Sequence, residues 1–67
     1  MVVIINNSDF ILPTATNLES ALLQHGLQNK LGIAVAVNEL VIPKNQWNSK
    51  ILNENDKILI ITPTQGG

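Results

Sequence analysis

The fold of this chain is decided by residues 57–67, which read KILIITPTQGG. Ile58 to Ile61 form an unbroken aliphatic run, mostly β-branched, which favours a strand. Pro63 has no N–H for a sheet ladder, so we expect strand pairing to end there. The four residues after Pro63 would reach roughly 13 Å when extended, at about 3.3 Å per residue. The stretch predicts a folded body at 1–62 that presents a flexible C-terminal tail at 63–67.

The tail ends in Gln65, Gly66 and Gly67. Its two glycines form a backbone tip without any Cβ atom, which suits insertion into the narrow active site of another enzyme. A glycine pair is equally typical of an ordinary frayed terminus. The choice between these two interpretations therefore depends on the kind of body that carries the tail.

The composition indicates one small globular domain. Of the 67 residues, 45% are hydrophobic and 13% are charged, which is too apolar for intrinsic disorder. The chain has no cysteine, which excludes a disulfide, a thiolate metal site and a cysteine nucleophile. The single histidine, His25, argues against a histidine-rich metal site.

Charge and hydropathy narrow the classes of partner. The net charge is −1 with four basic residues, which leaves no basic stripe for nucleic acid. The apolar runs are far shorter than the ~18 residues needed to span a bilayer, and no signal-peptide pattern is present. We therefore expect a cytoplasmic protein that binds neither nucleic acid nor membrane and is a monomer when free.

Two pairs of apolar runs, each interrupted by turn residues, predict two β-hairpins. In the first, the turn Asn6–Asp9 separates strands at 2–5 and 10–12. In the second, Asn38-Glu39 separates strands at 33–37 and 40–42, although Glu resists the positive φ of a tight turn. Pro43 then ends the strand, and the pattern predicts a helical or 3₁₀ turn at 44–49, a polar turn at 53–56 and a last strand at 57–62.

A short helix is predicted between the hairpins. Thr16 and Glu19 fit the capping-box pattern, which begins a helix at Thr16. We expect the helix to run to about His25 and Gly26 to end it in the αL conformation. Its buried face is predicted to hold four residues at helical spacing, with Leu23 on the flank: Leu18, Ala21, Leu22 and His25.

The order of elements predicts an α+β domain with a mixed sheet of four or five strands and the helix packed across one face. We expect the last strand to lie beside the first, because a long apolar strand is unfavourable at an exposed edge. This is the β-grasp arrangement of ubiquitin-like proteins.

Strand alternation predicts a docking face on the sheet. If one set of side chains points inward under the helix, the alternate set points outward and forms an apolar patch for a partner. The inward set is Val3, Ile5, Ile58 and Ile60, and the outward set is Val2, Ile4, Leu59 and Ile61.

Other conspicuous residues are predicted to be structural. We expect His25 to lie at the helix C-terminus, where the helix dipole favours it, and Trp47 to pack over the end of the sheet. Glu54 and Asp56 lie in a predicted turn, where we expect them to be solvated, and two carboxylates alone do not form a metal site.

The sequence resembles the sulfur carrier proteins of thiamine biosynthesis, the ThiS family, within the ubiquitin-like proteins. The resemblance covers essentially the whole chain. It rests on the combination of 36-AVN-38, 41-VIP-43, Trp47, 55-ND-56 and the terminal Gly66-Gly67. Asn55 stands where the family usually has glycine, and Pro63 where it has an apolar residue. Because Asn also tolerates αL, we expect the turn at Asn55 to form.

The resemblance implies a carrier, and no enzyme. It implies that an adenylating enzyme of the E1-like type uses ATP and magnesium to activate the Gly67 carboxylate. A sulfur donor, such as a cysteine desulfurase, then gives a thiocarboxylate on Gly67, and thiazole synthase takes the sulfur. No cofactor is bound by the chain itself. Two alternatives stay open: a related sulfur carrier of molybdopterin biosynthesis, and a ubiquitin-like binding module whose tail is never activated.

Overall fold

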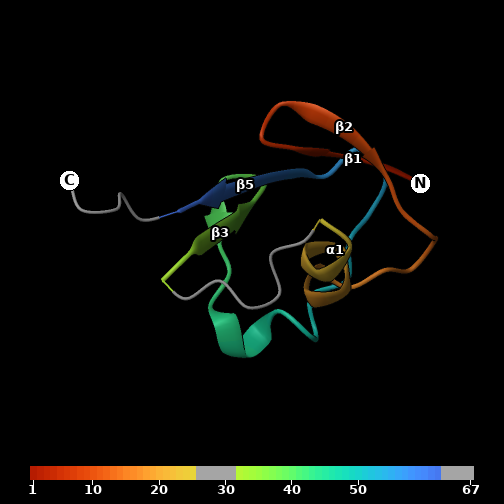
Figure 1. Cartoon of the computed structure of the whole chain (residues 1–67). Helices are drawn as coiled ribbons and strands as arrows, with labels where there is room; N and C mark the ends of the chain where they lie inside the picture. The colour runs from red at the N-terminus through yellow and green to blue at the C-terminus, as the bar shows by residue number, and fades with distance from the viewer. Residues whose placement is uncertain (26–31, 63–67) are drawn as a thin grey trace.

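The computed structural model describes residues 1–25 and 32–62 and has a five-stranded mixed sheet with an α-helix against one face (Figure 1). The strands lie in the order β2-β1-β5-β3-β4. The elements in chain order are β1 (Val2–Ile5), β2 (Ser8–Ile11), α1 (Leu18–Gln24), β3 (Ala34–Val37), β4 (Leu40–Val41), the 3₁₀ helix η1 (Lys44–Gln46) and β5 (Lys57–Ile61). The predicted α+β class, mixed sheet and β-grasp arrangement are confirmed.

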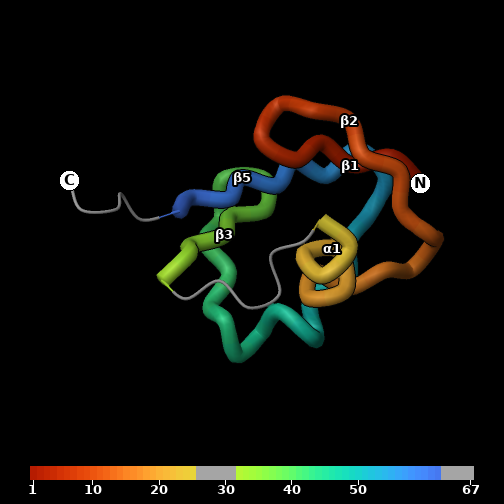
Figure 2. The backbone as a smooth tube through the Cα atoms, viewed as in Figure 1, coloured from red at the N-terminus to blue at the C-terminus, as the bar shows by residue number. Residues whose placement is uncertain are grey.

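The central strand of the sheet is β5, which lies between the β1–β2 hairpin and the β3–β4 hairpin (Figure 2). On one side it pairs in parallel with β1, with Ile5 opposite Ile58. On the other side it pairs antiparallel with β3, with Val35 opposite Ile60. The prediction that the last strand lies beside the first is confirmed. Its apolar character follows from this position, because a central strand must bury one face while both of its edges are paired.

Both hairpins turn on two residues with positive φ. Asn6 and Asn7 have φ values of 48° and 69°, and Asn38 and Glu39 have values of 51° and 72°. Positive φ at both central residues is the type I′ geometry that matches the twist of the flanking strands. Both predicted hairpins are confirmed. The first turn is shorter than expected, so β2 begins at Ser8 and not at Phe10.

Helix α1 begins one residue later than the sequence suggests. Its N-cap is Asn17, whose Oδ1 accepts a hydrogen bond from the Ser20 N–H at 2.8 Å. The Thr16 hydroxyl instead donates to the carbonyl of Pro13, and Thr16 is buried. The predicted capping box of Thr16 and Glu19 is therefore wrong, because Thr16 is used to close the loop before the helix. The helix ends with His25 as its C-cap, and Gly26 lies outside the described residues.

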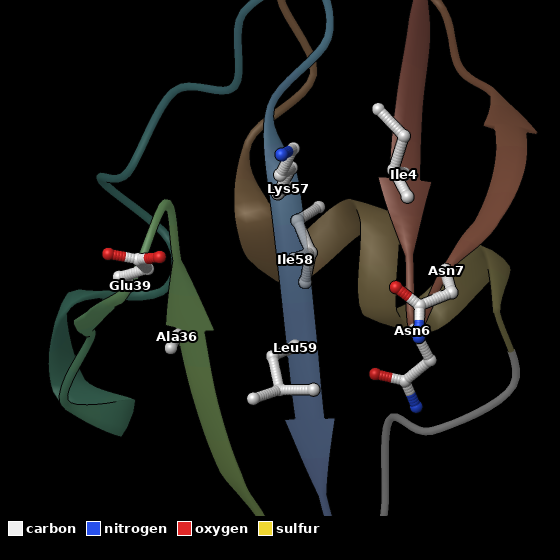
Figure 3. A pocket seen from close by; sticks show the side chains of 8 residues that line it. All are labelled: Ile4, Asn6, Asn7, Ala36, Glu39, Lys57, Ile58 and Leu59. Atoms are coloured by element: carbon white, nitrogen blue, oxygen red, sulfur yellow. The ribbon is translucent and has the colours of Figure 1, made fainter.

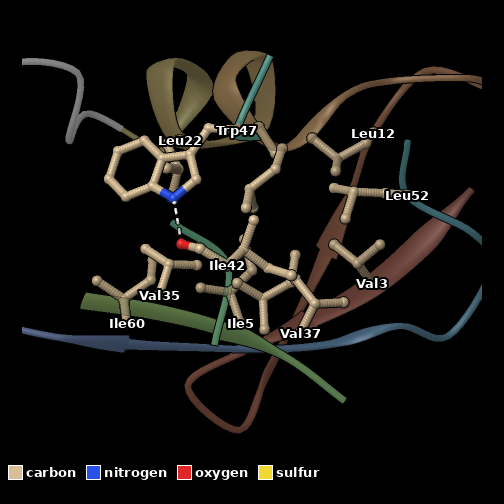
Figure 4. Packing of buried hydrophobic residues seen from close by; sticks show 13 residues of the cluster. Val3, Ile5, Leu12, Leu22, Val35, Val37, Ile42, Trp47, Leu52 and Ile60 are labelled. Carbon is tan, nitrogen blue, oxygen red and sulfur yellow. Dashed lines mark hydrogen bonds between the residues drawn. The ribbon is translucent and has the colours of Figure 1, made fainter. Parts of the chain in front are cut away.

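The core lies between the sheet and α1, and Figure 4 shows how its side chains meet. The predicted helix face is confirmed for three of its members, whereas His25 is exposed and that part of the prediction is wrong. The rings of His25 and Phe10 pack in a T-shaped arrangement, with 5.4 Å between the ring centroids. The buried cluster comprises Val3, Ile5, Leu12, Leu18, Ala21, Leu22, Val35, Val37, Ile42, Trp47, Leu52, Ile58 and Ile60.

Trp47 packs against this core, in agreement with the structural role predicted for it. Its indole is buried, and Nε1–H donates to the carbonyl of Ile42 at 2.9 Å (Figure 4). A buried indole N–H normally needs such a partner, since an unpaired donor is unfavourable in the interior. Trp47 also ends η1, so the 3₁₀ turn predicted after Pro43 is confirmed and serves to place this ring.

Asp56 is buried, so the prediction that it is solvated is wrong. Its Oδ1 accepts from Asn38 Nδ2 at 2.9 Å, and its Oδ2 accepts from the Asn53 N–H at 2.8 Å. Asn38 Oδ1 in turn accepts from the Lys57 N–H at 3.0 Å. These bonds tie the β3–β4 turn to the start of β5. Within the same turn Asn55 has a φ of 67°, which confirms the αL conformation predicted there.

Candidate docking face

The outward side chains of β5 form the centre of the candidate site. Ile58 and Ile60 are buried under α1, while Leu59 and Ile61 are 50% and 54% exposed. This alternation follows from the period of two in a strand, because the inward residues are needed for the core. Leu59 and Ile61 therefore remain on the open face of the sheet, as predicted.

Strand β1 contributes the neighbouring part of the same face. Val3 and Ile5 are buried, whereas Val2 and Ile4 are partly buried. Ile4 lies opposite Lys57 of β5 in the parallel ladder. Paired residues share a face of the sheet, so Ile4 points to the same side as the exposed Lys57. The inward and outward sets predicted for both strands are confirmed.

The register of the sheet adds residues that the sequence reasoning missed. On β2, Ile11 lies opposite Val2 and is 78% exposed. On β4, Val41 is 65% exposed and lies opposite Ala36 of β3, which in turn lies opposite Leu59 of β5. Because ladder partners share a face, the apolar surface extends from β2 at one edge to β4 at the other. We call this surface the docking face. It comprises Ile11, Val2, Ile4, Leu59, Ile61, Ala34, Ala36 and Val41.

A hollow of about 310 Å³ lies on the docking face over β1 and β5 (Figure 3). Ile4 and Leu59 supply apolar walls, and Lys57 and Glu39 supply charged groups near them. The full lining is Ile4, Asn6, Asn7, Ala36, Glu39, Lys57, Ile58 and Leu59. An apolar depression with a few charged groups around it is the kind of surface that receives a side chain of a protein partner.

β5, the last strand before residues 63–67, ends beside the docking face. β5 ends at Ile61, and Thr62 is exposed. The predicted site residues Gln65, Gly66 and Gly67, together with Pro63, lie outside the described residues.

Within residues 1–25 and 32–62, no three histidine or acidic side chains come together as a possible metal site. No helix in these two ranges is long and apolar enough to cross a membrane. Glu54 is exposed, as predicted, and its Oε2 accepts from the Val2 N–H at 3.1 Å.

With this geometry in place, comparison with known proteins decides the family. The family model described as "ThiS family" matches residues 3–67, which include the two terminal glycines and all of the sheet except Val2 at the start of β1. The chain belongs to the ThiS family.

A curated member of the ThiS family gives a sequence match of moderate identity. It is the sulfur carrier protein ThiS of Escherichia coli strain K12, which is 35% identical over 46 residues. The match covers 69% of this chain and 70% of the relative.

Solved ThiS structures agree with the fold. The crystal structure of the thiamine biosynthesis protein ThiS from Geobacter metallireducens has a TM-score of 0.84 at 14% identity and covers 100% of both chains. The solution NMR structure of a thiamine biosynthesis protein from the same organism has a TM-score of 0.77 at 16% identity and covers 100% of this chain and 88% of that one. At these identities the likeness concerns the fold alone.

Proposed function

We propose that this chain is a sulfur carrier of thiamine biosynthesis whose Gly67 carboxylate is adenylated and then converted to a thiocarboxylate. The observation that carries the proposal is the family match, which runs through the body to Gly66 and Gly67. The curated relative, by its name a sulfur carrier, supports the same activity.

The chemistry needs a terminal carboxylate and an activating enzyme. A carboxylate is a poor electrophile, so an adenylating enzyme of the E1-like type joins it to AMP from magnesium-bound ATP, and pyrophosphate leaves. The persulfide sulfur of a sulfur donor then attacks the acyl carbon, and AMP leaves with the electrons of the C–O bond. A thiol next attacks the donor's sulfur of the resulting acyl disulfide, so that a disulfide forms and the thiocarboxylate leaves with the electrons of the S–S bond. The thiocarboxylate is delivered to thiazole synthase.

In this scheme the chain is a substrate of other enzymes and no catalyst. The lack of cysteine supports a carrier that holds sulfur on its terminal carbonyl, since no thiol of its own competes for the activated acyl group. The scheme places the chain in the cytoplasm, with the ATP-dependent enzyme that activates it. No ATP or magnesium is bound by the carrier itself.

The docking face is the surface that we assign to the adenylating enzyme. Its apolar residues include Ile4 of β1 together with Leu59 and Ile61 of β5, the strand that precedes the tail, and Leu59 and Ile61 are half exposed. A partner that binds this face holds β5 and receives the tail that follows it. Thiazole synthase must accept the same tail and is expected to use an overlapping surface.

The intact mass of the protein isolated from its native cells tests the proposal. We expect part of the protein to carry a mass increase that corresponds to one oxygen replaced by sulfur, located on Gly67. Treatment with an alkylating agent should add the mass of one alkyl group to this species. Incubation of the purified chain with magnesium, ATP, the adenylating enzyme, a cysteine desulfurase, cysteine and a reducing thiol should produce the same species.

Two variants act as controls for the tail. Gly66→Ala adds a Cβ next to the reacting residue, and one extra residue after Gly67 removes the carboxylate from its position. Both should block thiocarboxylate formation while the circular dichroism spectrum and melting temperature stay unchanged. Normal thiocarboxylate formation in either variant, or an unmodified wild-type terminus after full incubation, would overturn the proposal and favour a binding module.

A further inference from the structure

The side-chain amide of Asn6 holds β5 close to the start of the tail. The Ile60 N–H donates to Asn6 Oδ1 at 2.8 Å, and Asn6 Nδ2 donates to the Ile60 carbonyl at 3.3 Å. The Asn6 backbone N–H donates to the carbonyl of Ile58 at 2.9 Å. One residue of the first hairpin therefore contacts two successive backbone positions on the same edge of β5.

The Asn6 side chain extends the β1–β5 ladder beyond the last backbone pair. β1 pairs with β5 at Ile4 and Ile5, and the chain then turns away at Asn6 with a φ of 48°. A carboxamide carries one carbonyl acceptor and N–H donors, as a peptide unit does, so the Asn6 side chain can pair both polar groups of Ile60. Figure 3 shows Asn6 just past the end of β1, beside β5.

Asparagine is suited to both tasks at this position. It is among the few residues other than glycine that adopt positive φ readily, which the hairpin turn requires. Its side chain is short enough to place the amide at the neighbouring strand. Glycine would keep the turn and lose both side-chain bonds, while aspartate would keep the acceptor for the Ile60 N–H and lose the donor for the Ile60 carbonyl.

Ile60 lies near the end of β5, where a contact has most influence on the direction in which the strand ends. It is the residue before the last one of β5, and the tail begins at 63, three residues later. Val35 of β3 lies opposite it on the other side. Both backbone polar groups of Ile60 bond to Asn6, so the end of β5 is bonded to the first hairpin on one edge while its other edge pairs with β3.

We propose that Asn6 is a positioning residue that sets the direction in which β5 delivers the tail to the adenylating enzyme. The inference rests on the proposed function for the activation step, and on the free structure for the contact. Without the Asn6 contact, the end of β5 is held on one edge only and samples more directions. Binding to the enzyme then costs more conformational entropy, because the strand end must be ordered at that step. Once bound, the tail reaches the same geometry, so the rate of the bound complex is unchanged.

Asn6→Gly and Asn7→Gly form a matched pair for the test. Both residues have positive φ in the same turn and both line the hollow on the docking face, so glycine fits either position. Within the described residues the Asn7 side chain forms no hydrogen bond. Only the first substitution removes the contact to Ile60.

The measurements are the steady-state kinetics of adenylation and amide hydrogen exchange in the free chain. Two lost hydrogen bonds predict a rise of about fivefold to tenfold in the KM for Asn6→Gly, with kcat changed by less than about twofold. Asn7→Gly removes the same side chain from the hollow and leaves the Ile60 contact in place, so its KM should rise less than that of Asn6→Gly. Asn6→Asp should give a KM between those of the wild type and Asn6→Gly. The Ile60 amide should exchange at least about tenfold faster in Asn6→Gly, while the Ile42 amide, which bonds to Val35 in the other hairpin, is unchanged.

The outcomes separate the two proposals. Equal KM values for the two glycine variants, or a raised KM with unchanged exchange at Ile60, would overturn the positioning role. Faster exchange at both Ile60 and Ile42 would mean general destabilisation and would overturn it too. If the wild-type chain is not adenylated at all, the proposed function fails at that point, and the positioning role fails with it even if Asn6 protects the Ile60 amide.

Discussion

Replacement of Leu59 by glutamate tests the docking face directly. Leu59 lies on the central strand with its side chain outward and 50% exposed. β5 is held by backbone ladders on both sides, which the substitution leaves in place. In the free protein we therefore expect a loss of less than about 1 kcal/mol in the free energy of unfolding, as is usual for exposed positions. Leu23→Glu is the matched control, because Leu23 is 47% exposed and lies on α1, away from this face.

The size of the effect on binding follows from the exposed half of Leu59. Full burial of a leucine side chain is worth about 1.5–3 kcal/mol, so burial of the remaining half by a partner contributes about 1 kcal/mol. Glutamate loses this contribution and places a carboxylate in an apolar contact, which costs at least about 1–3 kcal/mol when it has no partner. The sum is about 2–4 kcal/mol, which raises the Kd roughly 30-fold to 1,000-fold.

Isothermal titration calorimetry of each variant against the adenylating enzyme, at one salt concentration, measures this difference. Thermal melting of the free variants checks that both remain folded. We expect Leu59→Glu to weaken binding strongly and Leu23→Glu to leave the Kd close to that of the wild type. An unchanged Kd for Leu59→Glu, or equal weakening by the two variants, would refute the assignment of this face. A collapsed fold in Leu59→Glu would show that Leu59 acts as part of the core.

Two stability predictions concern the turns that frame β5. Asp56→Ala should lower the free energy of unfolding by about 2–4 kcal/mol in urea titrations, because it leaves the Asn38 amide and the Asn53 N–H without their carboxylate partner. A loss below 1 kcal/mol would mean that water replaces the carboxylate. Glu39→Gly should raise stability by about 1 kcal/mol, or Tm by about 4–8 °C, since glycine adopts the φ of 72° without strain. A lower Tm would show that the Glu39 side chain is needed.

Much of the fold could be predicted because it depends on local patterns. The β-branched runs and their period of two gave both the strands and the buried and outward sets on β1 and β5. The tight turns could be placed because asparagine is one of the few residues that accept positive φ, as the values at Asn6, Asn38 and Asn55 illustrate. A tight turn depends on the residues within it, so it could be predicted without knowledge of any distant contact.

What could not be predicted depends on residues far apart in the chain. Asp56 is buried because Asn38, 18 positions away, reaches it, whereas a turn sequence alone favours a solvated carboxylate. Asn6 and Ile60 are 54 positions apart, so their contact cannot be seen before the register of β1 and β5 is known. Thr16 and Asn17 are both good N-caps, and the choice of Asn17 follows from the hydrogen bond that Thr16 makes to Pro13.

The middle position of β5 also determines how the molecule responds to force. A partner that grips the tail and pulls applies the load along β5, which has β1 on one edge and β3 on the other. The load then acts as shear on two ladders at once, so many hydrogen bonds must break together before the strand slides. An edge strand peeled from its end would instead lose its bonds one at a time. The position of β5 therefore suits a carrier of the proposed kind, because a pull along the strand loads two ladders together.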